Sequence, residues 1–87
     1  MAGHKDKRLL DDQEIAAMFA DPGMAERYPP ILTADQAAAL AQVPKETLYG
    51  WSSQGRLDGC KAKVGKHLRI HRNKFLQLIF NEGINDQ

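Results

Sequence analysis

The chain of 87 residues has one cysteine, no internal repeat and no apolar run approaching the length of a membrane span. A single cysteine cannot form an internal disulfide, which fits a reducing, cytoplasmic setting. A membrane-spanning helix needs about 20 consecutive apolar residues, and the basic residues near the N-terminus are not followed by the apolar segment of a signal peptide. We therefore expect a small cytoplasmic protein of one domain, with no membrane partner.

The sequence also lacks a recognisable catalytic set. No Ser/His/Asp or Cys/His combination falls at a usable spacing, and the carboxylates cluster near the N-terminus. Cys60, His67 and His71 suggest a zinc site, but the alternation around them places the cysteine on one face and the histidines on the other. A fourth ligand is also missing. We expect no enzyme activity, no cofactor and no metal, with Cys60 as a buried structural residue.

The net charge of +1 hides a strongly basic segment. Residues 56–74 carry seven Lys and Arg against one Asp, whereas the segments before and after it are acidic. Electrostatic fields act locally at a surface, so this segment matters more than the total charge. It predicts a polyanionic partner such as nucleic acid.

Residues 31–57 predict two short helices joined by a tight turn. Thr33 followed by Gln36 forms a capping box at the start of the first helix. Pro44 suits the first turn of the second helix, where no amide hydrogen is needed, and Gly55 is expected just beyond its end. Two helices in this arrangement are typical of a helix-turn-helix unit.

The second helix carries the residues expected to contact bases. Leu48 and Trp51 are expected to face the core, and Trp51 fits the core better than a base-stacking role. The polar residues avoid that face and lie toward the N-terminal end, which meets base edges in helix-turn-helix docking. They are Lys45, Glu46, Thr47 and Tyr49. For each residue alone, the alternative of a solvated helix face stays open.

A two-residue period from Cys60 to Ile70 predicts a β-hairpin, with Gly65 and Lys66 in a type II′ turn. We expect the apolar residues on one face, and Lys61, Lys63, His67 and Arg69 on the other, with Lys66 at the tip. The predicted DNA-binding wing residues are Lys61, Lys63, Lys66, His67, Arg69 and Arg72. If the five Lys and Arg met phosphates, log K would fall with log salt at a slope of about −4 to −5. The alternative is a solvated hairpin whose lysines prevent edge aggregation.

The flanking segments complete the predicted fold. Asp11 followed by Glu14 predicts a capped N-terminal helix, and Phe75 to Phe80 predict a last helix that packs on the core and ends at Gly83. The expected organisation is an N-terminal extension over 1–30, a winged helix-turn-helix domain over 31–82 and a tail over 83–87. The fold class is mainly α, with a small two-stranded hairpin as the wing.

The segment LTADQAAALAQVPKETLYGWSSQGRL, followed by KVGKHLRIHRNKFLQLI, resembles the excisionase-type winged-helix domains of the MerR-like superfamily, which include AlpA-like regulators. The resemblance covers residues 31–80 and implies a recognition helix over 45–51 and a wing over 61–69. Two positions depart from the family: Gly50 stands where a long side chain such as arginine is common, and His71 replaces a frequent proline.

The resemblance implies a sequence-specific protein that binds double-stranded DNA in the nucleoid. Its role would be that of an excisionase-like recombination directionality factor or an AlpA-like transcription regulator of a mobile element. The implied partners are DNA, a recombinase or integrase, or RNA polymerase, and a second copy of the protein on DNA. The alternative is a protein-interaction module that reuses the fold, with the acidic extension and the apolar last helix as docking surfaces.

Overall fold

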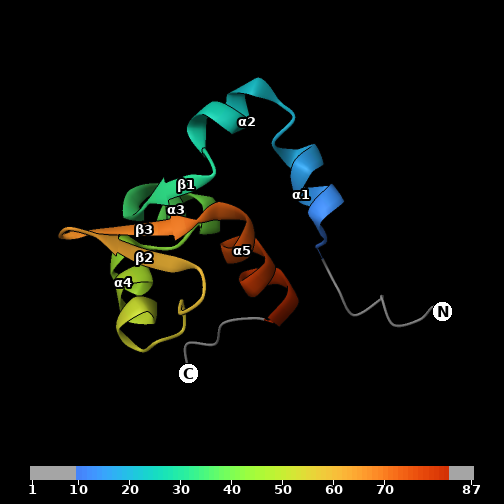
Figure 1. Cartoon of the computed structure of the whole chain (residues 1–87). Helices are drawn as coiled ribbons and strands as arrows, with labels where there is room; N and C mark the ends of the chain where they lie inside the picture. The colour runs from blue at the N-terminus through green and yellow to red at the C-terminus, as the bar shows by residue number, and fades with distance from the viewer. Residues whose placement is uncertain (1–9, 83–87) are drawn as a thin grey trace.

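The computed structural model describes residues 10–82 and places a small antiparallel sheet among short helices (Figure 1). In chain order the elements are α1 (Asp12–Met18), α2 (Pro22–Arg27), β1 (Ile31–Thr33), α3 (Ala34–Ala41), α4 (Lys45–Ser53), β2 (Lys61–Val64), β3 (His67–His71), α5 (Arg72–Gln77) and the π-helical turn η2 (Leu78–Glu82). The mainly helical, winged helix-turn-helix fold predicted from the sequence is confirmed. The predicted tail over 83–87 lies outside the described residues.

The helix ends follow the predicted local chemistry. At α3, the backbone amide of Thr33 donates to the side chain of Gln36 at 2.8 Å, and the amide of Gln36 donates to the hydroxyl of Thr33 at 3.1 Å. Asp11 and Glu14 form the same reciprocal pair at α1. After α4, Gly55 adopts a φ of 79°, a left-handed conformation that glycine adopts without strain. These caps satisfy backbone groups that the helices leave unpaired.

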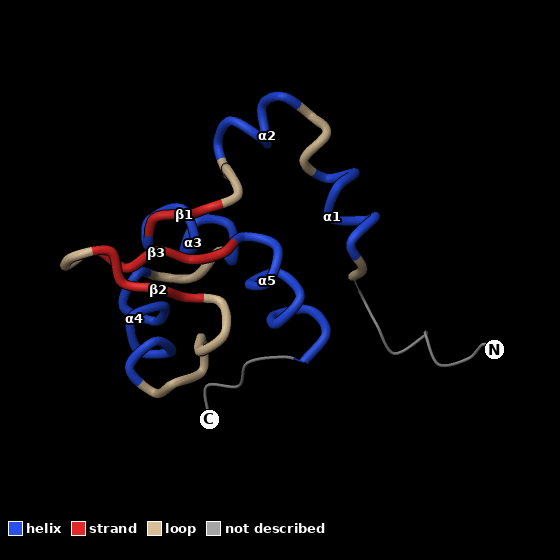
Figure 2. Tube along the Cα trace, viewed as in Figure 1, coloured by secondary structure: helices blue, strands red, loops and turns tan. Residues whose placement is uncertain are grey.

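The sheet contains one strand more than the predicted two-stranded wing. Its strand order is β1-β3-β2 (Figure 2). The register places Leu32 of β1 opposite Ile70 of β3. Both side chains are fully buried. A strand of three residues shows no clear alternation, which is why the sequence did not predict it. Because β1 runs directly into Thr33 and α3, this pairing anchors the helix-turn-helix unit to the base of the wing.

The predicted separation of the wing into an apolar and a basic face is wrong. The register pairs Lys61 with Ile70, Ala62 with Arg69, Lys63 with Leu68 and Val64 with His67. Directly opposed residues share a face, and a two-residue loop makes Val64 and His67 an opposed pair. Lys61 and Lys63 therefore lie on the same side as the buried residues of β3. Gly65 has a φ of 66°, in accord with the predicted type II′ turn.

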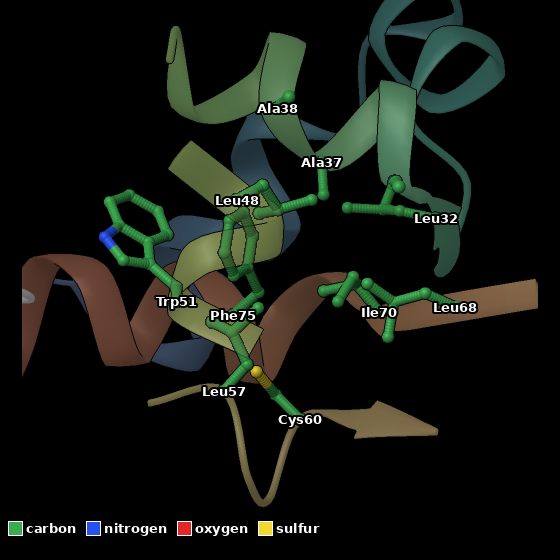
Figure 3. Close-up of a cluster of buried hydrophobic side chains, with 11 residues drawn as sticks. Leu32, Ala37, Ala38, Leu48, Trp51, Leu57, Cys60, Leu68, Ile70 and Phe75 are labelled. Atoms are coloured by element: carbon green, nitrogen blue, oxygen red, sulfur yellow. The ribbon is translucent and has the colours of Figure 1, made fainter. Parts of the chain in front are cut away.

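The main core lies where α3, α4, β3 and α5 meet (Figure 3). Leu48 and Trp51 of α4 point inward as predicted and pack with Phe75 of α5 and Ile70 of β3. Burying a large apolar side chain stabilises a fold by about 1.5–3 kcal/mol. This packing fixes the second helix of the helix-turn-helix unit by its inner face, so that its outer face is held in one orientation.

The N-terminal extension packs against the domain through a second cluster. Ile15 of α1 and Phe19, the residue that follows α1, bury their side chains against Leu76 of α5. Hydrogen bonds add to this contact: the side chain of Asn81 donates to the carbonyl of Leu10 and accepts from its amide, both at 2.9 Å. In Figure 1, α1 and α2 arch away from the wing tip, on the opposite side of the domain.

Arg72 joins this extension to the rest of the domain. Its guanidinium donates to the carbonyl of Tyr28 at 2.9 Å and to the side chain of Asn73 at 2.8 Å, and lies 3.7 Å from the centre of the Phe19 ring. Only 9% of the residue is exposed, and burial lowers the pKa of its guanidinium. A buried arginine held by several hydrogen bonds stabilises the packing of its neighbours.

Candidate nucleic-acid interface

An open groove of about 850 Å³ runs between the wing, α4 and the start of α3. Its cationic residues are Lys45 of α4 and Lys61, Lys63, Lys66 and Arg69 of the hairpin, and its one acidic residue is Asp35 of α3. Five cations, from α4 and the hairpin, thus line a groove that contains a single carboxylate. The corrected register accounts for Lys61 and Lys63, which it places on the side of the sheet that faces α4. Arg69 is opposed to Ala62 and belongs to the other side of the sheet, although it also lines the groove.

The four residues predicted to contact bases lie in the N-terminal half of α4, and only two of them line the groove. Lys45 and Tyr49 line the groove, and 48% of Tyr49 is exposed. Glu46 and Thr47 belong to the same helix but do not line the groove. Glu46 is exposed, and Thr47 is half-buried. The four side chains therefore cover two neighbouring parts of the helix surface, and Leu48 is buried on the inner face.

Lys45 forms an ion pair within the groove. Its ammonium nitrogen lies 2.8 Å from a carboxylate oxygen of Asp35, and the two side chains are 51% and 74% exposed. The hydrogen bond to Asp35, and then the charge of Asp35, raise the pKa of Lys45. The pair connects the first turn of α3 with the first turn of α4. The rest of α3 and the turn between the helices separate these two turns in the sequence.

Lys61 differs from the other wing lysines because its ammonium is occupied. It donates to the backbone carbonyl of Ser52 at 2.9 Å and to the Ser52 hydroxyl at 3.0 Å, and it lies 3.7 Å from Asp58. Only 25% of its side chain is exposed. The carbonyls at the C-terminal end of a helix carry partial negative charge, which a lysine neutralises. Lys61 thus ties the base of the wing to the end of α4.

The remaining predicted wing residues reach solvent at the groove. Lys63, Lys66 and His67 are exposed, and the two lysines make no hydrogen bond or ion pair with residues 10–82. Arg69 is half-buried and donates to the carbonyl of Leu68 at 3.0 Å, and its guanidinium has further N–H donors. These four side chains are placed to meet an anion that enters the groove.

The structure places Arg72 outside this groove, buried against Phe19 and Tyr28. Its nearness in sequence to Arg69 suggested a wing contact, but β3 ends at His71 and the chain then turns into α5. We therefore omit Arg72 from the candidate DNA contacts. The groove contains one further charged residue, Asp35, which was not predictable from the sequence because its pairing with Lys45 depends on how α3 and α4 pack together.

Cys60 is buried as predicted, whereas His67 and His71 are exposed. Burial raises the pKa of the Cys60 thiol to about 11. Among residues 10–82, no three His, Cys, Asp or Glu side chains are grouped closely enough to hold a metal ion. In the same part of the chain, no helix has the length and apolar character needed to cross a bilayer.

Comparison with known proteins identifies the domain that carries this groove. The family profile of the helix-turn-helix domain matches residues 31–79, which is more than half of the chain and includes both helices, the wing and α5. Searches of curated proteins and of solved structures gave no match. The match confirms the predicted resemblance at the level of a DNA-binding domain, and the N-terminal extension lies outside it. The chain belongs to the helix-turn-helix domain family and is a DNA-binding helix-turn-helix protein.

Proposed function

We propose that the protein binds specific sites in double-stranded DNA through the groove between α4 and the wing. The observation that carries this proposal is the convergence of five Lys and Arg residues from α4 and the hairpin on one groove that contains a single carboxylate. Phosphate contacts provide most of the sequence-independent affinity for DNA, and groups on a helix that reach base edges provide specificity.

The two elements divide these tasks. The major groove of DNA is about 12 Å wide and admits one helix, so α4 enters it with its N-terminal turn leading. Lys45 and Thr47 then contact base edges, and Tyr49 contacts a base or a phosphate. Lys63 and Lys66, at the projecting end of the hairpin, bind the adjacent phosphates. Lys61 holds the wing and α4 together.

The biological role that fits this mechanism is that of an excisionase-like recombination directionality factor or an AlpA-like transcription regulator of a mobile element. Support for this role comes from the resemblance of residues 31–80 to excisionase-type domains, a range that the family match over residues 31–79 covers almost completely. The protein acts without catalysis of its own, by occupying and bending DNA in the cytoplasm. A recombinase or RNA polymerase then responds to the occupied site.

Selection from a random-sequence duplex pool, followed by fluorescence anisotropy, tests the proposal. Thr47→Ala and Tyr49→Phe should weaken binding to the selected duplex more than binding to the unselected pool. The double substitution of Lys63 and Lys66 by Met should weaken binding to both. Absence of binding to either duplex at low salt would contradict the proposal and would favour a protein-interaction module.

A further inference from the structure

Asp35 is a carboxylate inside a groove that otherwise gathers positive charge. It lies in the first turn of α3, 74% of its side chain is exposed, and it is the one acidic residue that lines the groove. An acidic residue in the first turn of a helix interacts favourably with the helix dipole. This interaction does not require the side chain to point in any one direction around the helix. The helix dipole therefore does not explain why the carboxylate faces the groove.

The carboxylate acts on the lysine that leads α4 into DNA. Its oxygen lies 2.8 Å from the ammonium nitrogen of Lys45, and each side chain is more than half exposed. The charge of Asp35 offsets much of the attraction of Lys45 for a phosphate several ångströms away, because the repulsion from the carboxylate then nearly matches the attraction to the ammonium. The ammonium has three donor hydrogens, so one bond to Asp35 leaves donors for a base edge.

We infer that Asp35 is a specificity-determining residue that weakens binding to arbitrary DNA more than binding to the preferred site. Sequence-independent binding depends on phosphate contacts, so it loses the charge of Lys45 and gains the repulsion of a carboxylate. Specific binding keeps the bond from Lys45 to a base, with the ammonium already oriented by Asp35. A protein discriminates between ligands by such unfavourable elements as well as by attractive contacts. This inference rests on the proposed function of the groove.

The test compares Asp35→Asn with a matched carboxylate outside the groove. Asp58 provides the match, because its side chain is 72% exposed, lies 3.7 Å from the ammonium of Lys61 and is not part of the groove lining. Each substitution keeps the shape of the side chain and removes one negative charge near the wing. Circular dichroism establishes that both variants keep the helical fold.

Affinities for the selected duplex and for the unselected random-sequence pool are then measured across a salt series. We expect Asp35→Asn to bind the unselected pool severalfold more tightly at low salt, with a smaller gain for the selected duplex, so that the ratio of the two affinities falls. The slope of log K against log salt for the pool should become steeper by about 0.9, because Lys45 now neutralises a phosphate. Asp58→Asn should leave the affinity ratio unchanged.

Two outcomes would overturn the inference. In one, Asp35→Asn leaves the affinity ratio and the salt slope at the wild-type values; in the other, it changes them no more than Asp58→Asn does. Failure of the proposed function has a different signature, because the wild-type protein would then bind neither duplex at low salt. As a further check, the double variant Asp35→Asn, Lys45→Met should bind the pool with the salt slope of the wild type. It lacks the unpaired Lys45 ammonium that makes the slope of Asp35→Asn steeper.

Discussion

Replacing Lys63 should flatten the salt dependence of DNA binding, whereas replacing Lys61 should not. Lys63 is exposed in the groove and makes no bond with residues 10–82, so its ammonium can neutralise a phosphate. The ammonium of Lys61 already bonds to both oxygens of Ser52 at 2.9 and 3.0 Å. A phosphate would have to break these bonds to gain the same contact.

The expected magnitudes follow from the number of unoccupied cations. Lys63, Lys66 and Arg69 are available, and at about 0.9 per phosphate they give a slope of about −2.7. The slope for Lys63→Met should be about −1.8. Between about 50 and about 200 mM salt, affinity should therefore fall by about 40-fold for the wild type and by about 12-fold for Lys63→Met. Lys61→Met should keep the wild-type slope and lose affinity at every salt concentration, because the wing is no longer tied to α4.

Anisotropy titrations of a labelled random-sequence duplex at several salt concentrations provide these slopes. The unfolding transition of each variant, measured in urea, shows how much of an affinity loss follows from a weakened fold. A Lys61→Met slope as shallow as that of Lys63→Met would refute the structural role of Lys61. A wild-type slope of −4 to −5, the value predicted when Lys61 and Arg72 are counted as phosphate contacts, would refute the assignment of both residues.

Gly50→Ala should raise the free energy of unfolding in urea by about 1 kcal/mol, because a Cβ at this helical position meets no atom within 4 Å; a decrease would contradict the packing. Arg72→Met should lower that free energy by about 2–4 kcal/mol, since it leaves the Tyr28 carbonyl without its donor and removes the contact with Phe19, while the salt slope of DNA binding stays unchanged. Cys60 should react slowly with a disulfide reagent at pH 8 until the protein unfolds, because burial raises the pKa of its thiol to about 11. The unfolded thiol ionises near 9.0, so stability is lost as pH rises through the interval between these two values. At pH 10 the wild type should lose about 1 kcal/mol relative to Cys60→Ala, and an equal pH dependence in both proteins would exclude this effect.

Features set by neighbours in the sequence were predictable. Thr33 and Gln36 cap α3 because they are three residues apart, and this spacing is visible without a structure. The helical spacing of Leu48 and Trp51 predicts that both face the core, and Gly55 indicates where α4 ends. The hairpin, the helix pair and the residues of the wing follow from the same local patterns.

Features set by pairing between distant segments were not predictable in this way. The strand β1 is recognisable only beside β3, which follows much later in the chain. The type II′ turn was predicted, but the apolar pattern placed Val64 and His67 on different faces of the hairpin. A two-residue turn makes them an opposed pair, and opposed residues share a face. The bond from Lys61 to Ser52 depends on how the wing folds back on α4, so a count of wing lysines overestimates the number of phosphate contacts.

The central claim, that α4 and the wing form the DNA-binding surface, is tested most directly by nuclear magnetic resonance. Isotope-labelled protein is titrated with the selected duplex, and the backbone amide signals are followed residue by residue. Our account predicts that the largest changes fall on residues 45–50 and 61–69, with the amides of α1 and α2 little affected. Changes centred on α1 and α2, with the groove residues unaffected, would contradict it.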